Sequence, residues 1–147
     1  MRILIQRVTR ANIEINRKIV SEISNGMLIF VCVMANDNQK NVDKMVLKIS
    51  KIRIFKDELG KTNKSLSDVS GQALIVSQFT LSADTRKGNR PGFSSAANPE
   101  KGKKVYESFI KKFMEKGFDV RCGVFGADMN VNLINDGPMT IWIDDEN

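Results

Sequence analysis

The residues best suited to chemistry are four consecutive ones, Ser77-Gln78-Phe79-Thr80, which combine two hydroxyls and an amide. A hydroxyl nucleophile needs a neighbouring base. No Ser-x-x-Lys spacing follows Ser77, because Thr80 occupies that place. Two interpretations remain open. The hydroxyls could bond to the backbone at the end of a strand, or the strand end could supply backbone N–H groups that stabilise a developing oxyanion.

The absence of histidine restricts the possible chemistry more than any other feature of the composition. It excludes Ser-His-Asp and Cys-His nucleophile systems and every histidine metal site. Cys32 and Cys122 lie far apart with no CxxC spacing, so we expect free buried thiols and neither a disulfide nor a metal pair. The sequence contains no Walker loop, GxGxxG or HExxH motif, so no cofactor and no metal are expected.

A basic stretch, Arg86-Lys87-Gly88-Asn89-Arg90, lies a few residues before Phe93. It could hold nucleic-acid phosphates while the aromatic ring stacks on a base. A solvated loop with one anchoring aromatic residue explains the same pattern. The formal charge of +6 favours a polyanionic partner such as nucleic acid.

The third candidate is the turn Asn135-Asp136-Gly137-Pro138 between two alternating apolar runs. Asn, Asp and Gly tolerate positive φ, and Pro fixes φ and lacks a backbone donor. The local sequence favours a hairpin turn that contains a proline. The alternative is a cis Gly-Pro bond, which would turn two carbonyl oxygens to one side and could grip an ammonium group.

The elements that must position these residues follow from the apolar periodicity. Residues 27–34 form an unbroken apolar run, which suits a strand buried on both faces, and Asn25-Gly26 before it is a hairpin signal. Asn98-Pro99-Glu100 is a helix start and Gly117 the expected stop. The other predicted elements are strands at 1–8, 11–15, 19–23, 73–76, 118–124, 129–133 and 139–143, a helix over 42–52 and loops over 56–71 and 82–97.

This order predicts an α/β (α+β) fold with a curved, barrel-like, mostly antiparallel or mixed sheet and two main helices packed against it. At 147 residues and 41% hydrophobic, the chain is expected to form a single domain over residues 1–147. No apolar run is long enough to span a membrane, and the strand pattern starts at the first residues. We therefore expect no signal or transit peptide, no membrane partner and a cytoplasmic location.

Three stretches together resemble one family: SQFTL at 77–81, KGNRPGF at 87–93 and NDGPMT at 135–140. They resemble the D-aminoacyl-tRNA deacylases of the D-Tyr-tRNA deacylase type. The opening IQRV at 5–8 and the run GVFGADM at 123–129 are similar to that family as well. The resemblance spans essentially the whole chain and implies the barrel-like fold of those enzymes.

The resemblance also implies an activity: hydrolysis of the ester that joins a D-amino acid, and in some members glycine, to the terminal ribose of tRNA. It implies a homodimer in which a cis Gly137-Pro138 bond enters the partner's active site. The carbonyls of Gly137 and Pro138 would hold the substrate's amino group, and the side chain of an L-amino acid would collide with the turn. Met139 stands where the family more often has valine, and Gly92 where it often has serine.

By the same resemblance, the catalytic stretch is expected to stabilise the oxyanion, chiefly through the backbone N–H groups of Phe79 and Thr80, with the Thr80 hydroxyl assisting and Gln78 orienting the substrate. Arg7 is expected to support the Gly-Pro turn. The remaining expected contacts are Phe93 and Met129 around the terminal adenosine, Met139 and Thr140 in the substrate-binding turn, and Arg86, Lys87 and Arg90 on tRNA phosphates.

Two other functions compete with this interpretation. A noncatalytic RNA-binding protein could use the same basic loop, and it would retain tRNA without releasing an amino acid. A metabolic hydrolase of small esters would act on D-amino acid esters without any tRNA.

Overall fold

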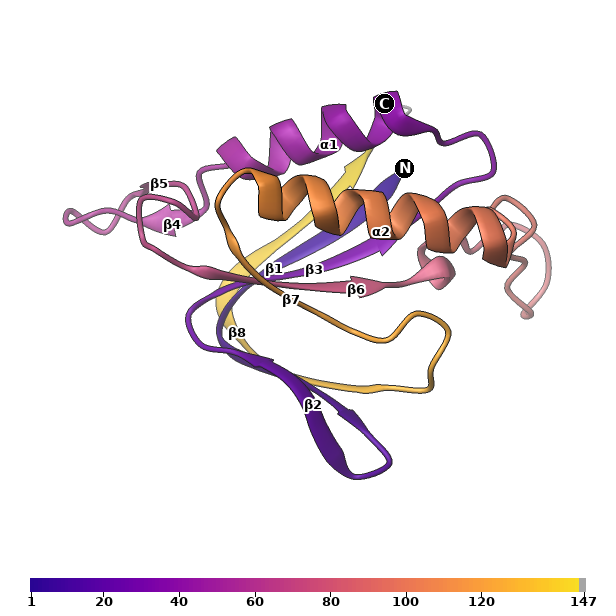
Figure 1. The fold of residues 1–147 in the computed structure, drawn as a ribbon, viewed down its shortest axis with the longest axis horizontal. Coiled ribbons are helices and arrows are strands. Elements are labelled where there is room, and N and C mark those ends of the chain that lie inside the picture. The colour runs from indigo at the N-terminus through magenta and orange to yellow at the C-terminus, as the bar shows by residue number, and fades with distance from the viewer. Residues whose placement is uncertain (146–147) are drawn as a thin grey trace.

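The computed structural model describes residues 1–145. Figure 1 shows a curved sheet with two helices side by side over one face. The strands of the main sheet are β1 (Arg2–Ile15), β2 (Lys18–Ile23), β3 (Gly26–Cys32), β6 (Gln72–Ser77), β7 (Asp119–Cys122) and β8 (Asn130–Asp144). The remaining elements are α1 (Gln39–Lys51), β4 (Phe55–Lys56), β5 (Thr62–Lys64), the 3₁₀ turn η1 (Phe79–Ser82) and α2 (Pro99–Glu115).

The sheet is organised around β1, which pairs antiparallel with β2, β3 and β8. On the far side of β3, the pairs β3–β6 and β6–β7 are parallel, so the sheet is mixed. It curves strongly, and β2 and the first half of β8 curl away from the helices (Figure 1). The predicted fold class is therefore confirmed.

The core lies on both faces of β3. The apolar stripe of α1, including Met45 and Ile49, is buried against the face that carries Ile29. On the opposite face, Leu28 packs with Ile13 inside the curl of the sheet. The uninterrupted apolar run is thus buried on both sides, as its composition predicts.

The start of α2 is also as predicted. Asn98 is the N-cap and its side-chain Oδ1 accepts a hydrogen bond from the Lys101 amide at 2.9 Å, with Pro99 as the first helical residue. This capping fixes where the helix begins. Figure 1 shows that this end of α2 lies near the loop that follows η1.

The hairpin predicted at Asn25-Gly26 is wrong. Strands β2 and β3 do not pair with each other but lie end to end along one edge of β1, since Ile23 is opposite Ala11 and Gly26 opposite Val8. The glycine is needed for space rather than for a turn. A Cβ at Gly26 would lie 1.9 Å from the carbonyl oxygen of Gln72 on the neighbouring strand.

The hairpin favoured for residues 135–138 is wrong as well. The two apolar runs belong to a single strand, β8, which pairs with β1 on both sides of the proline. Thr140 is opposite Gln6 and Asn135 opposite Val8, so the extra residues of β8 bulge out between two paired segments. We call residues 135–140 the Gly-Pro bulge. Its Gly137–Pro138 peptide bond is cis, the alternative that the sequence left open.

Two further boundaries differ from the prediction. Residues 1–8 and 11–15 form one strand, β1, whose pairing with β8 shifts register between Gln6 and Arg10. The predicted loop over 56–71 contains β5, which pairs antiparallel with β4. Both strands are short and largely polar, so they carry too little alternation to be found from periodicity.

Candidate functional site

A cavity of about 560 Å³ lies where the parallel strands β3 and β6 end. This volume is within the range of pockets that hold small ligands. The end of β6, the loop before α2, the first turns of α2 and the β7–β8 connection surround it. Its lining residues are Val33, Val76–Phe79, Phe93, Ala96–Pro99, Gly102, Phe125–Met129 and Val131.

The predicted catalytic stretch reaches this cavity in part. Ser77, Gln78 and Phe79 line it, whereas Thr80 does not. The Thr80 hydroxyl instead accepts a hydrogen bond from Gln78 Nε2 at 2.6 Å. The first bond of the 3₁₀ turn is donated by the Leu81 amide to the Gln78 carbonyl at 3.2 Å, so the amides of Phe79 and Thr80 precede it.

The predicted apolar wall is also at the cavity. Phe93 and Met129 both line it. The ring of Phe93 meets the ring of Phe79 edge to face, with centroids 5.3 Å apart. The thioether of Met129 lies over Gly123, where a Cβ would come within 2.8 Å of its sulfur. The absence of a Cβ at Gly123 therefore leaves room for the Met129 side chain at this position.

The opposite wall includes residues that the sequence interpretation missed, among them Asn98, Gly102 and Phe125. Gly102 lies in α2, and a Cβ there would be 3.5 Å from Phe125 Cζ. Tyr106 lies one turn further along α2. Its ring is tilted by 42° against that of Phe125, with the centroids 5.8 Å apart, and its hydroxyl donates to the Ile75 carbonyl at 2.8 Å. Burial raises the pKa of Tyr106, so its hydroxyl stays protonated. The sequence signal that could have indicated this site is Gly102 itself, because a glycine inside an amphipathic helix often marks the close approach of another part of the chain.

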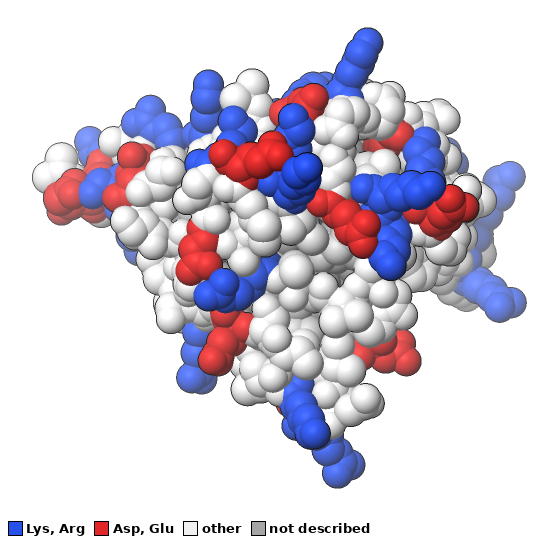
Figure 2. All heavy atoms as spheres, viewed as in Figure 1, with Lys and Arg blue, Asp and Glu red and all other residues white. Residues whose placement is uncertain are grey.

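The basic residues Arg86, Lys87 and Arg90 do not line the cavity but lie on the exposed loop that precedes α2. The loop is closed by paired backbone bonds between Asp84 and Gly92, at 2.8 and 3.0 Å. Arg86 binds the Asp84 carboxylate with Nε and Nη2 and holds the pKa of that carboxyl below its usual range. Figure 2 shows that side chains of both charges are interspersed over the upper part of the face drawn, while the area below its centre is largely uncharged.

No residue of the Gly-Pro bulge, Met139 and Thr140 included, lines the cavity of its own chain, and Arg7 does not line it either. Gly137 and Pro138 are exposed at the surface. Arg7 is buried beneath the bulge, and its Nε lies 2.8 Å from Asp136 Oδ2. Its Nη1 donates to the Ile54 carbonyl. The predicted support of the turn by Arg7 thus has a geometric basis.

Asn135 ties the two ends of the bulge together. Its Nδ2 donates to the Arg7 carbonyl at 2.9 Å and to the Met139 carbonyl at 3.0 Å. The Thr140 hydroxyl accepts from Gln6 Nε2 at 3.2 Å. The sequence interpretation placed Asn135 only in a turn. Its two acceptors are backbone carbonyls, one of them far away in sequence, so the residue types do not identify them.

Both cysteines are free; Cys32 is buried and Cys122 half-buried. Burial raises the pKa of the Cys32 thiol, which donates to the Phe79 carbonyl at 3.5 Å. In residues 1–145, no group of three or more His, Cys, Asp or Glu side chains could hold a metal ion. None of the helices in the described part of the chain is long and apolar enough to cross a membrane.

The fold and the cavity define a mixed-sheet protein with a ligand-sized site between a strand end, a helix start and a connecting loop. A family model described as D-Tyr-tRNA(Tyr) deacylase matches residues 4–144. The D-aminoacyl-tRNA deacylase of Ruegeria pomeroyi is 53% identical over 144 residues, covering 98% of this chain and 99% of the relative. That of Desulfotalea psychrophila is 49% identical over 146 residues, covering 99% and 98%. The chain belongs to the D-Tyr-tRNA(Tyr) deacylase family.

Two solved structures are similar over nearly their whole length. One, described as c-Myc DNA unwinding element binding protein, has a TM-score of 0.92 and 38% identity over 98% of both chains. The other, described as a probable eukaryotic D-amino acid tRNA deacylase, has a TM-score of 0.85 and covers 97% of both chains. At 16% identity the second shows a common fold alone.

Proposed function

We propose that this protein is a D-aminoacyl-tRNA deacylase, a carboxylic ester hydrolase that releases a free D-amino acid and tRNA. The observation that carries the proposal is family membership over residues 4–144 together with a cavity lined by Ser77, Gln78 and Phe79. Relatives that cover the full chain are named for this activity. Glycine carried by tRNA would be a second substrate, because it has no side chain for the site to exclude.

The proposed chemistry depends on positioning rather than on a histidine base. An aminoacyl ester is already activated, and the neighbouring ribose 2′-OH can direct water. The protein then has to hold the ester and stabilise the oxyanion. We assign this to the backbone N–H groups of Phe79 and Thr80 at the start of η1. Gln78 would orient the substrate, and the Thr80 hydroxyl, which Gln78 holds, would assist without forming a covalent bond.

The cavity would take the terminal adenosine of tRNA. Its volume of about 560 Å³ suits a nucleoside, and Phe93 and Met129 provide apolar surface for the base. Lys87 and Arg90, on the exposed loop that precedes α2, would meet the phosphates that follow. Arg86 would contribute less, because Asp84 already occupies its guanidinium group.

Chiral selection would come from the Gly-Pro bulge of a second subunit. The bulge is exposed and lies outside the cavity of its own chain, which supports a role at the site of another chain. The carbonyls of Gly137 and Pro138 would hold the substrate's amino group, with Met139 and Thr140 beside them. Arg7 and Asn135 fix the bulge from within. The working unit would then be a cytoplasmic homodimer that rejects L-aminoacyl-tRNA by collision.

Incubation with D-Tyr-tRNA and, separately, L-Tyr-tRNA tests the proposal. Release of tyrosine from the D form alone is the expected result. Retention of both RNAs without release would mean a noncatalytic RNA-binding protein. Hydrolysis of D-tyrosine ethyl ester at a comparable rate would instead indicate a small-ester hydrolase. Light scattering or sedimentation of the same sample tests the dimer.

A further inference from the structure

Ser82 is a buried hydroxyl residue of η1 that the proposed mechanism does not use. The residue is 1% exposed, and its Oγ donates to the Phe79 carbonyl at 2.7 Å. The sulfur of Cys32, which is buried at the end of β3, lies 3.5 Å from the same oxygen. A hydroxyl buried in this way needs a partner, because an unpaired polar group away from water is unfavourable. Two buried side chains thus hold the Phe79 carbonyl from the inner side of the turn.

The Phe79 carbonyl and the Thr80 N–H belong to one peptide group. This group is planar and trans, so its C=O and its N–H point to opposite sides. A donor that fixes the direction of the carbonyl therefore fixes the direction of the N–H as well. Because Ser82 and Cys32 hold the carbonyl toward the buried side, the Thr80 N–H is directed away from that side.

The preceding peptide group is held in the same way. The Leu81 amide donates to the Gln78 carbonyl at 3.2 Å, on the side of that peptide opposite to the Phe79 N–H. Within residues 1–145, the amides of Phe79 and Thr80 donate to no other group of the chain. These are the two N–H groups assigned above to the oxyanion. Both are unused donors whose directions are set by a bond to the carbonyl on the other side of the peptide.

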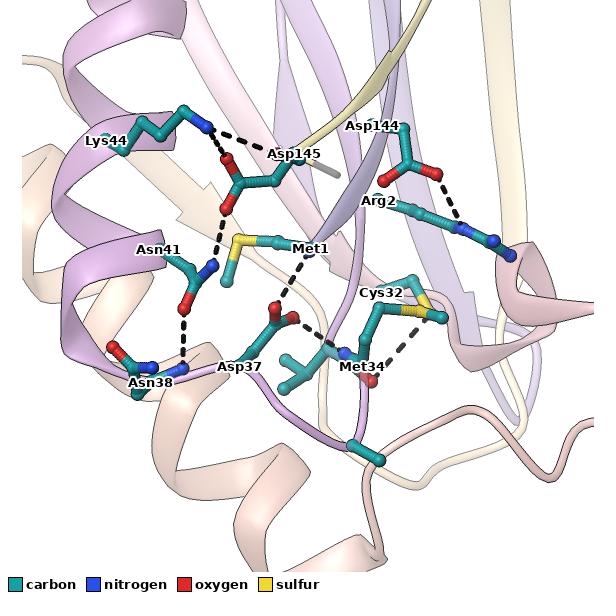
Figure 3. Close-up of polar contacts among 12 residues, drawn as sticks. Met1, Arg2, Cys32, Met34, Asp37, Asn38, Asn41, Lys44, Asp144 and Asp145 are labelled. Atoms are coloured by element: carbon teal, nitrogen blue, oxygen red, sulfur yellow. Dashed lines mark hydrogen bonds and ion pairs between the residues drawn. The ribbon is translucent and has the colours of Figure 1, made fainter. Parts of the chain in front are cut away.

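Two further side chains donate to carbonyls of the turn. Arg2 Nη1 donates to the Leu81 carbonyl at 3.3 Å. Figure 3 shows the Arg2 guanidinium beside the Asp144 carboxylate, to which its Nε is bonded at 3.0 Å. Ser95 Oγ donates to the Ser82 carbonyl at 3.1 Å. Arg2 and Ser95 therefore orient peptide groups later in the turn, whereas the Ser82 hydroxyl acts on the one that carries the Thr80 N–H.

We propose that Ser82 is a positioning residue for the catalytic turn, because its hydroxyl holds the Phe79 carbonyl and so aims the Thr80 N–H at the oxyanion. The bond also polarises the peptide group, which makes the N–H on the other side a better donor. Without the hydroxyl, the carbonyl loses its 2.7 Å bond and the peptide group can tilt. Oxyanion stabilisation depends on donors that are fixed in advance. The effect on turnover rests on the proposed deacylase function; the orientation of the peptide group does not.

The test compares the unaltered chain with Ser82→Ala, which loses the hydroxyl, and Ser82→Thr, which keeps it. Ser95→Ala is the matched control, because it also removes one serine hydroxyl that is bonded to a carbonyl of the same turn. NMR of the substrate-free protein measures the carbonyl carbon of Phe79 and the amide nitrogen of Thr80. Steady-state deacylation of D-Tyr-tRNA gives kcat and KM, and thermal unfolding gives the stability of each variant.

In Ser82→Ala, the Phe79 carbonyl carbon and the Thr80 nitrogen are expected to move upfield, because both are deshielded when the carbonyl accepts a hydrogen bond. In Ser95→Ala, the corresponding changes are expected at the Ser82 carbonyl carbon and the Ala83 nitrogen. Both alanine variants lose one hydrogen bond, so their melting temperatures should fall by a similar amount, about 2–4 °C.

Turnover is expected to separate the two alanine variants. In Ser82→Ala, kcat falls about tenfold with KM unchanged, which is less than the loss of a whole oxyanion donor. In Ser95→Ala, kcat stays within about twofold of the unaltered value, and Ser82→Thr recovers most of the activity. A difference in kcat between two variants of equal stability would not arise from a merely structural role.

Unmoved Phe79 and Thr80 resonances in Ser82→Ala would overturn the positioning role. An equal fall of kcat in Ser95→Ala, or a change in KM alone, would overturn it as well. If the resonances move while kcat stays the same, the Thr80 N–H is not an oxyanion donor and the proposal is wrong for catalysis. If Ser82→Thr does not fold, the comparison of the two alanine variants decides. Failure of the unaltered chain to release tyrosine would refute the deacylase function, and the NMR comparison would then decide the orientation by itself.

Discussion

Gly102 allows the cavity to be narrowed without altering any residue assigned to the chemistry. It is buried in α2 and lines the cavity. A Cβ at this position would lie 3.5 Å from Phe125 Cζ, which is an ordinary van der Waals distance. The Ala variant therefore fits without strain, while a longer side chain must extend into the space proposed for the terminal adenosine.

The two substitutions are expected to separate stability from binding. Gly102→Ala removes a flexible residue from a helix, which stabilises the fold by about 0.5–1 kcal/mol. For a chain of this size, the melting temperature then rises by about 1–4 °C. Gly102→Leu keeps most of this gain but fills part of the cavity. A loss of about 1.4–2.8 kcal/mol of adenosine binding raises KM about 10–100-fold. The value of kcat changes little, because the proposed position of the ester is at the start of η1 and not beside Gly102.

Steady-state deacylation of D-Tyr-tRNA measures both constants, and thermal unfolding monitored by circular dichroism measures stability in the same preparations. The alanine variant is the control for the change in the helix itself. If Gly102→Leu is folded, at least as stable as the unaltered chain, and has the same KM, the cavity does not hold the substrate and the assignment of the site is wrong.

The remaining predictions concern the chemistry, the tRNA contact and the bulge. Thr80→Ala should lower kcat by less than about 100-fold, below the loss of a full oxyanion donor, and complete inactivity of a folded variant would favour a covalent role. Replacing Lys87 and Arg90 with alanine should raise KM and reduce the slope of log affinity against log salt by about 2, whereas Lys61→Ala in the β4–β5 hairpin should leave the slope unchanged. Asn135→Ala removes two hydrogen bonds to backbone carbonyls, worth about 1–3 kcal/mol. It should increase hydrolysis of L-Tyr-tRNA relative to the D form, and an unaltered D/L ratio in the folded variant would count against selection by the bulge.

Elements with strong periodicity or strong caps could be predicted from the sequence. The start of α2 at Pro99 follows from local bonds of the Asn98 side chain, and the burial of residues 27–34 follows from composition. The two mistaken hairpins have a common cause. Glycine and proline indicate that something unusual happens to the backbone, but they do not say whether it is a turn. At Gly26 the reason is a close strand, and at Gly137 it is a bulge.

The candidate site, like the fold, could be predicted from the sequence only in part. Ser77 and Gln78 could be located because they carry polar side chains at the end of an apolar strand, and Phe79 follows them directly. Gly102 carried only the general signal of a glycine inside a helix, and Phe125 carried none, because the contact between them joins residues well separated in sequence.

The cavity keeps its shape mainly through backbone bonds between segments that are distant in sequence. The Gln78 amide donates to the Val31 carbonyl at 2.8 Å, the Gly123 amide to the Ile75 carbonyl at 3.1 Å, and the Ala97 amide to the Val33 carbonyl at 2.9 Å. Backbone dipoles do not titrate, so their contribution at a developing oxyanion is the same at every pH where the fold persists. The mechanism proposed for this chain, which has no histidine, relies on such fixed groups. Small displacements of a cavity wall are therefore expected to lower its activity more than the loss of any single hydroxyl.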